Sequence, residues 1–443
     1  MVISRHISGK FRNYRYIIEA ILMSIYLFIP WVVIDGKPLM RLDIPARKFY
    51  FLGSIYIPQE GYFLHVFLLT MGLSLFFFTS LLGRMWCGWA CPQTIFTDVY
   101  DIIGRLVLGK KYGKKDAPLV SKFLLYLLWA IMAVFFSFEI AAYFNDPRQM
   151  LNDLFSGTMK GNFYPSFIAF LAVALYLDMT LVREQFCRYA CPYARFQTVL
   201  MDAHSYNVTY DYKRGEPRRN KKVKIGDCTA CNMCLVVCPT GIDIREGANV
   251  GCIACAKCID ACTVQMGKEG KKTLIDYDSL ARIDHNEKIK WIRPRTLIYG
   301  TILGIIGAIG LFLLYTRVPL HISAIPDRNI APMVVPEKKV RNFYSVHLIN
   351  MSYDDRQLKL SLDPGSLKVP MELLSGNENN ILKLSKNNSI DLRLIVESGN
   401  LPDKEKVSSK IYKINLIVED INDPSYKKIQ VLTLVLPGDP ELN

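Results

Sequence analysis

The chain has 443 residues, which is enough for two or three domains. Apolar residues make up 51% of it and its mean hydropathy is +0.17, which excludes an ordinary soluble protein and indicates several membrane spans. The formal net charge is +14, and the positive charge lies in the loops between apolar segments. This distribution is typical of a membrane protein and argues against nucleic-acid binding.

Five apolar segments have about the length of a membrane-spanning helix, roughly 20 residues. They run from Tyr16 to Ile34, from Tyr62 to Leu82, from Lys122 to Phe144, from Phe163 to Val182 and from Leu297 to Tyr315. The first segment is long for the apolar part of a signal peptide, and Val33–Lys37 offers no small-residue cleavage site. We therefore expect about five transmembrane helices, the first of them uncleaved.

Lysine and arginine sort the loops between these segments. The N-terminus and residues 83–121 and 183–296 are rich in them, whereas residues 145–162 hold only Arg148 and Lys160. Positively charged loops stay on the cytoplasmic side. Five spans with a cytoplasmic N-terminus then place residues 317–443 on the opposite side of the membrane.

A motif of two cysteines and a proline occurs twice, at the expected cytoplasmic ends of spans. Residues 87–92 read Cys-Gly-Trp-Ala-Cys-Pro, and residues 187–192 read Cys-Arg-Tyr-Ala-Cys-Pro. The first copy leads into an amphipathic stretch that suits a helix on the membrane surface, with Asp98, Asp101 and Arg105 on its polar face. Two such units are expected to pack about a pseudo-twofold axis and to bring four cysteines together: Cys87, Cys91, Cys187 and Cys191.

These four cysteines have several interpretations. If the span continues through the motif as a helix, sulfurs four residues apart lie on one face, and the proline either kinks that helix or opens the next one. The functional interpretations are a thiolate metal site, a redox dithiol, or packing against a cofactor. Among metals, soft thiolates favour Cu(I). The ordinary alternative is a set of buried small apolar residues, which the repeated spacing argues against.

The remaining eight cysteines lie between residues 228 and 262. They are spaced Cys-x2-Cys-x2-Cys-x3-Cys twice, as Cys228, Cys231, Cys234 and Cys238, then as Cys252, Cys255, Cys258 and Cys262. This is the run that binds two 4Fe–4S clusters in bacterial ferredoxins, where the fourth cysteine of each run serves the other cluster. One cluster is therefore expected on Cys228, Cys231, Cys234 and Cys262, and the other on Cys252, Cys255, Cys258 and Cys238. A structural zinc site would normally show two Cys-x2-Cys pairs instead.

The expected domains follow from these features. Residues 1–182 hold the N-terminal tail, four spans and both cysteine–proline motifs, residues 183–296 form a cytoplasmic ferredoxin-like domain, and residues 297–316 are the fifth span. A basic stretch leads into the cluster run: Arg218, Arg219, Lys221, Lys222 and Lys224. A membrane haem usually takes two histidines from the spans, and only His65 lies in one, so no haem is expected.

Residues 317–443 have the pattern of an all-β domain. Apolar residues alternate with polar ones in three runs: Leu358, Leu360 and Leu362; Leu392, Leu394 and Val396; and Tyr412, Ile414, Leu416 and Val418. Turn signals separate the runs at residues 363–365, 398–400 and 422–424. Seven or so short strands in about this length favour an immunoglobulin-like sandwich.

The whole set of motifs, in this order, closely resembles the FixG/CcoG type of cytochrome c oxidase accessory protein. Five stretches carry the resemblance: Gly36–Pro38, Cys87–Thr94, Arg183–Tyr193, Lys213–Pro217 and Cys238–Arg245. It covers nearly the whole chain, including the immunoglobulin-like tail.

The resemblance implies a multi-pass protein of the bacterial inner membrane, with its clusters in the cytoplasm and its C-terminal domain in the periplasm. It further implies a Cu(II) reductase that supplies Cu(I) to a cbb-type haem–copper oxidase, with copper chaperones and the oxidase assembly machinery as partners. On this interpretation electrons from a cytoplasmic donor pass through the ferredoxin-like domain to the four motif cysteines, which bind or reduce copper.

Two other functions stay open at this point. The paired motifs and the ferredoxin run also resemble the NapH/NosR group, whose members are electron-transfer subunits of membrane quinol dehydrogenases. Alternatively, the clusters only stabilise a scaffold without redox activity. The identity of the electron donor, the copper stoichiometry and the existence of a homodimer cannot be read from the residues.

Overall fold

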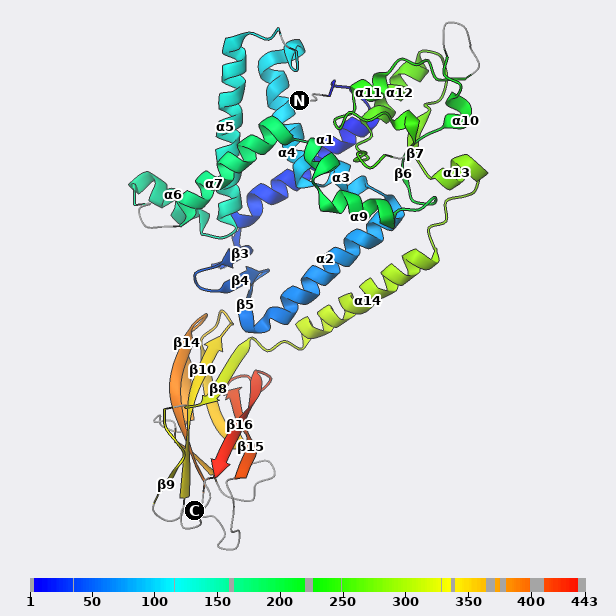
Figure 1. The fold of residues 1–443 in the computed structure, drawn as a ribbon. Helices are drawn as coiled ribbons and strands as arrows, with labels where there is room; N and C mark the ends of the chain where they lie inside the picture. The colour runs from blue at the N-terminus through cyan, green and yellow to red at the C-terminus, as the bar shows by residue number, and fades with distance from the viewer. Residues whose placement is uncertain are drawn as a thin grey trace. The chain divides into compact units, whose positions relative to one another are not determined.

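The computed structural model describes residues 4–34, 36–114, 116–158, 163–219, 226–247, 249–327, 329–335, 339–363, 371–374, 380–398 and 410–436. These residues belong to two compact units (Figure 1). The first comprises Met1–Arg47 and Gln59–Leu311, and the second comprises Lys48–Pro58 and Phe312–Asn443. Several residues that the sequence singles out lie outside the described part: Lys160, Lys221, Lys222, Lys224, Pro364, Gly365, Gly399 and Asn400.

The first unit is mainly helical. Its helices are α1 (Lys10–Phe28), α2 (Gly61–Leu82), α3 (Met85–Trp89), α4 (Pro92–Leu108), α5 (Leu119–Ala142), α6 (Pro147–Ser156), α7 (Tyr164–Leu177), α8 (Gln185–Tyr189), α9 (Pro192–Leu200), α10 (Tyr212–Gly215), α11 (Met233–Val236), α12 (Lys257–Gly267), α13 (Leu280–His285) and α14 (Pro294–Tyr315), the last of which ends in the second unit. Its strands are β1 (Val33–Ile34), β2 (Lys37–Pro38), β3 (Met40–Asp43), β6 (Asn207–Tyr210) and β7 (Ile275–Asp278).

Within the described residues, four helices are long and apolar enough to cross a membrane. They are Pro58–Leu82, Leu119–Ala142, Tyr164–Val182 and Pro294–Tyr315, and they coincide with the second to fifth predicted spans. Helices α2 and α14 lie side by side in opposite directions (Figure 1). Gly300 contacts Phe77 near one end of the pair, and Gly310 contacts Val66 near the other. These glycines allow the two helices to come close.

The first predicted span is not among these four helices. Helix α1 ends at Phe28, where a 3₁₀ turn and the β1–β2 hairpin follow. Its first three turns hold Arg12, Arg15 and Glu19, which are all buried against other parts of the unit. The rest of the helix, residues 20–28, is about 14 Å long at about 1.5 Å per residue, against a hydrocarbon core of about 30 Å. The total of five spans therefore stays a prediction.

The polar face of α4 differs from its prediction. Asp98 and Asp101 are 2% and 1% exposed, so this face is buried in the protein rather than directed to water. Arg183 pairs with Asp101, and three cations surround Asp98. The apolar side packs on α5 through Phe136 and its neighbours. Helix α4 is therefore covered on its polar face and on the first part of its apolar face, whereas Ile102 and Leu106 of the apolar face are exposed.

Asp98 holds three segments of the chain together. Its carboxylate accepts hydrogen bonds from Arg12 at 2.8 Å and Arg15 at 2.5 Å, both in α1, and from Lys257 in α12 at 3.3 Å. Burial raises the pKa of this carboxyl, but Lys257, Arg15 and Arg12 hold it well below its ordinary value. The ionised carboxylate therefore stabilises the fold above the ordinary pKa near 3.8. This contribution is lost only as the pH falls through the lowered value.

Asp98→Asn is expected to destabilise the protein by about 3–5 kcal/mol, because it leaves buried cations without their carboxylate. Glu287→Gln is the matched control, since Glu287 forms an exposed pair with Lys290 at 2.9 Å and such pairs contribute about 1 kcal/mol or less. Thermal unfolding of the two purified variants in detergent measures the difference. Equal midpoints for both variants would contradict the structural role given to Asp98.

The second unit is a sandwich of two antiparallel sheets. One sheet has the order β12 (Met371–Leu374), β14 (Ser389–Ser398), β10 (Lys339–Asn350), β8 (Leu320–Pro326), with β9 (Met333–Val335) on β10. The other has the order β13 (Ile381–Leu384), β11 (Arg356–Asp363), β15 (Lys410–Asp420), β16 (Lys427–Leu436). The alternating residues of the three predicted runs fill the space between the sheets, with Leu358, Leu394, Val396, Ile414, Leu416 and Val418 fully buried. The predicted all-β sandwich is confirmed.

A hairpin from earlier in the chain also belongs to this unit. Its strands are β4 (Lys48–Phe51) and β5 (Ser54–Tyr56), joined by Leu52 and Gly53, both at positive φ. A two-residue turn with positive φ at both positions matches the twist of the strands it joins. Ile55 of the hairpin is fully buried and packs in a small apolar cluster with Met351.

Candidate iron–sulfur and thiol site

The two cysteine runs of the ferredoxin-like region have the same backbone conformation. Helices α11 and α12 begin directly after Asn232 and Ala256, whose φ angles are 56° and 62°. Two residues earlier, Ala230 and Ala254 have φ angles of 53° and 52°. A left-handed conformation costs a residue with a side chain about 1–2 kcal/mol. Its occurrence at equivalent places in both runs indicates that each loop must curl around the same kind of group.

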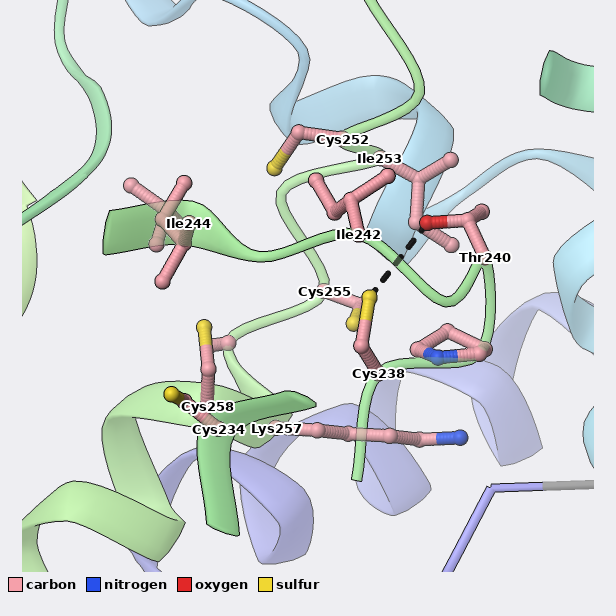
Figure 2. A pocket seen from close by; sticks show the side chains of 13 residues that line it. Cys234, Cys238, Thr240, Ile242, Ile244, Cys252, Ile253, Cys255, Lys257 and Cys258 are labelled. Carbon is pink, nitrogen blue, oxygen red and sulfur yellow. Dashed lines mark hydrogen bonds between the residues drawn. The ribbon is translucent and has the colours of Figure 1, made fainter. Parts of the chain in front are cut away.

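The loops line two pockets, and each pocket contains the cysteines of one expected cluster. The first is lined by Cys238, Cys252, Cys255 and Cys258, together with Cys234 and apolar residues such as Ile244. Figure 2 shows that Cys238 enters it from a different segment than the other three. The second pocket is lined by Cys228, Cys231, Cys234 and Cys262. The structure thus gathers the cysteines in the crossed groups, while their role as cluster ligands stays a prediction.

The donor set of these pockets fits iron–sulfur clusters. In a 4Fe–4S cluster each thiolate binds its own iron, so the four sulfurs stand around the cluster rather than around one ion. Accordingly, no group of three or more His, Cys, Asp or Glu side chains in the described part of the chain could hold a single metal ion. Backbone N–H groups also face the sulfurs, with Ala254 N–H 3.4 Å from Cys252 Sγ and Leu274 N–H 3.5 Å from Cys262 Sγ.

Burial makes these thiols weak acids. It raises the pKa of Cys252 to about 12 and that of Cys234 to about 11, and it also raises the pKa of Cys255 and Cys258. Metal ligation requires the thiolate form. Thiols in such an interior therefore lose their protons when iron binds the sulfur.

Single alanine substitutions test the crossed grouping. Cys238→Ala and Cys255→Ala are expected to remove one cluster, and Cys231→Ala and Cys262→Ala the other, because each pair lines one pocket. Iron content and the EPR spectrum of the dithionite-reduced protein identify which cluster is lost. Thr229→Ala, which changes a pocket residue without a thiol, should retain both signals. Pairing of Cys238 with Cys231 in these spectra would contradict the crossed pattern.

The two cysteine–proline motifs have equivalent local structures. The span before each ends at a residue with positive φ, Gly83 at 56° and Arg183 at 53°. A short helix follows, α3 or α8, and the second cysteine then caps the next helix, with proline at its first position. Proline is favoured there because that position needs no N–H donor. Of the two predicted roles of the proline, opening the next helix is therefore the observed one.

The motif cysteines lie next to the loop of the second run. Cys87 and Cys187 are buried and pack with Ile253 and Cys255 in one small group of side chains. Burial raises the pKa of both Cys87 and Cys187 to about 12, and in each case Cys91 and Cys191 contribute to the increase. Cys87 and Cys187 thus lie together beside the loop, while a site that combines all four motif cysteines stays a prediction.

Gly88 of the first motif packs directly on the backbone of the cluster loop. A Cβ atom at this position would lie 2.5 Å from the carbonyl oxygen of Ile253 and 2.8 Å from Cα of Cys255. Both neighbours are backbone atoms, which cannot move aside as a flexible side chain does. Only glycine therefore fits at position 88.

Gly88→Ala is expected to destabilise the protein by about 1–3 kcal/mol through overpacking. Gly72→Ala is the matched control, because nothing lies within 4 Å of a Cβ atom at Gly72. Unfolding midpoints and iron content of the two variants in detergent provide the comparison. A Gly88→Ala protein with unchanged midpoint and iron content would show that the motif and the loop do not pack as described.

Sequence reasoning missed two polar residues of this region. Gln197 is fully buried and its Oε1 accepts a hydrogen bond from Cys87 Sγ at 3.2 Å. Arg84 is 1% exposed and donates to the carbonyl oxygens of Val250, Cys252 and Ala194. One signal was available in the sequence, since Arg84 lies three residues before Cys87 and Gln197 lies ten residues after Cys187. Their burial could not be inferred from those positions.

Three family models match the chain. A 4Fe-4S dicluster domain covers residues 182–280, and a 4Fe-4S binding domain covers residues 64–115. The IG-like fold at the C-terminal of FixG covers residues 310–436. The second of these models includes Cys87 and Cys91, for which the residues alone favoured no iron–sulfur role.

Curated relatives match over most of their length. Protein RdxA of Cereibacter sphaeroides is 35% identical over 385 residues, which is 82% of either chain. Protein RdxB of the same organism is 33% identical over 90% of this chain and 89% of its own. Nitrogen fixation protein FixG of Rhizobium meliloti is 31% identical over 82% of this chain and 79% of its own.

Proposed function

The chain belongs to the FixG/Rdx family of 4Fe–4S electron-transfer proteins, and from this premise we propose that it reduces Cu(II) to Cu(I) during assembly of a cbb-type cytochrome c oxidase. Four apolar helices support its association with a membrane. The copper chemistry and the role in oxidase assembly are the parts that go beyond the family.

The observation that supports this proposal most directly is the contact of two motif cysteines with the cluster loop. The buried side chains of Cys87 and Cys187 pack with that of Cys255, and Gly88 packs on the loop backbone. Soft thiolates bind Cu(I) in preference to harder metals. A thiolate site in direct contact with an iron–sulfur centre can therefore receive an electron and retain the reduced copper ion.

The residues divide the work between them. When bound, the clusters supply one-electron transfer, and each Cu(II) ion takes up one electron to become Cu(I). Copper is the substrate, and pairs of thiolates among Cys87, Cys91, Cys187 and Cys191 bind it, since no three such side chains in the described part of the chain are placed to hold one ion. The apolar side chains around Cys255, including Ile253, keep water away from the path between the two sites.

We propose the orientation of a bacterial inner-membrane protein, with the clusters on the cytoplasmic side and the immunoglobulin-like domain in the periplasm. The positive loops support the first part. The second part requires one crossing more than the four apolar helices supply, because four spans would leave both ends on one side. The first predicted span, Tyr16 to Ile34, is the segment proposed for that crossing. The proposed partners are a cytoplasmic electron donor, copper chaperones and the oxidase assembly machinery.

Reoxidation of the reduced protein by copper tests this function. The protein is purified anaerobically in detergent, reduced and freed of reductant, and Cu(II) is then added while cluster absorbance and Cu(I) bound to a chelator are followed. One Cu(I) is expected for each cluster electron lost. In the Cys87→Ala/Cys187→Ala variant the rate should fall about 10-fold or more, since even loss of an outer-shell partner of a metal site costs about 10–100-fold.

Two controls make this result specific. The variant should retain the iron of both clusters and should be reoxidised by ferricyanide as fast as the unchanged protein, which shows that its clusters are intact. Loss of iron in the variant would instead assign the motif cysteines to an iron–sulfur group. Reoxidation by a quinone analogue but not by Cu(II) would overturn copper reduction in favour of a quinol dehydrogenase subunit.

A further inference from the structure

Arg84 lies between the motif cysteines and the loop of the second ferredoxin-like cysteine run. It lies two residues after the end of α2, at the N-cap of α3, and is 1% exposed. Its Nη1 donates to the carbonyl oxygens of Val250 and Cys252, at 3.2 Å for the latter, and its Nη2 donates to the carbonyl oxygen of Ala194 in α9. One guanidinium therefore joins the end of a span, the loop of the second cysteine run and the helix after the second motif.

The charge of this guanidinium has no carboxylate partner among the described residues. Its burial lowers the pKa of Arg84, and the groups that act in the opposite direction are four cysteines: Cys87, Cys252, Cys191 and Cys187. Its Nε has no hydrogen-bond partner within the described part of the chain. Arginine nevertheless stays protonated in proteins, so a full positive charge is buried here.

The second motif has an acidic residue where the first has Arg84. Gly83 and Arg183 occupy equivalent positions at positive φ, so Glu184 is the counterpart of Arg84. The buried arginine of the second motif, Arg183, forms ion pairs with Asp101 and with Glu184, at 3.5 Å for the latter. A buried charge without a partner costs several kcal/mol. Arg84 therefore requires an anion that a carboxylate does not supply, and the groups around it that can become anionic are thiols.

We propose that Arg84 is the counter-charge shared by the four motif cysteines and the cluster expected on Cys252, Cys255, Cys258 and Cys238, and that it raises the reduction potential of this cluster. A cluster held by four thiolates becomes more negative on reduction, and its potential depends on nearby charge and hydrogen bonds. A fixed positive charge in a medium of low dielectric constant stabilises the reduced form more than the oxidised form.

The proposal concerns only the clusters and does not depend on copper reduction, so either can fail without the other. Arg84→Gln removes the charge and keeps a hydrogen-bond donor, whereas Arg84→Lys keeps the charge and removes the planar fork. Arg282→Gln is the control for loss of one charge in the same region, since Arg282 is exposed and only weakly paired with Asp278 at 3.6 Å.

The measurement is an EPR-monitored redox titration of each purified variant, with iron content determined in parallel. We expect Arg84→Gln to lower the midpoint potential of one cluster and to leave the other unchanged, while Arg84→Lys and Arg282→Gln retain both potentials. Unchanged potentials in Arg84→Gln, an equal shift in Arg282→Gln, or a lowered potential in Arg84→Lys would overturn the proposal.

The variants also decide the case in which a cluster fails to assemble. If Arg84→Gln lacks a cluster that Arg84→Lys retains, the positive charge itself is required, as proposed. If both variants lack that cluster, the fork of hydrogen bonds to the carbonyl oxygens is the requirement, and the role as counter-charge is overturned.

Discussion

The first unit depends on one buried carboxylate. Asp98 of α4 binds Arg12 and Arg15 of α1 and Lys257 of α12. Segments that lie far apart in the chain therefore meet at one carboxylate. Arg15 continues this contact to the carbonyl oxygen of Cys255, 3.4 Å away. Because a buried ion pair is costly unless its geometry is complete, this cluster fixes the relative position of α1, α4 and the second cysteine run.

The cysteine–proline motifs and the ferredoxin-like cysteine runs lie next to each other. Gly88 of the first motif has no side chain, which allows it to pack on the backbone of the second run. The two motifs share their backbone conformation but not their electrostatics. Arg84 faces thiols, whereas the equivalent position of the second motif holds Glu184, which pairs with Arg183.

The sequence predicted those features that a local pattern determines. Thiol spacing indicated both cluster runs, apolar length indicated four helices, and alternation indicated the strands whose Leu394 and Ile414 fill the sandwich core. It failed where a distant residue decides the environment. Periodicity placed Asp98 and Asp101 on one face of a helix but could not show that arginines elsewhere in the chain cover that face, and likewise it could not reveal that Arg84 is buried among cysteines.

The N-terminal end of α1 has a consequence for how the chain is made. Gly9 precedes this helix, and the backbone N–H groups of Phe11 and Arg12 donate to the carboxylate of Asp260, at 3.2 and 2.8 Å. At about 5–20 residues per second, the ribosome adds this acceptor roughly 12–50 seconds after the donors. The N-terminus of α1 therefore lacks these hydrogen-bond acceptors until the second cysteine run has been synthesised.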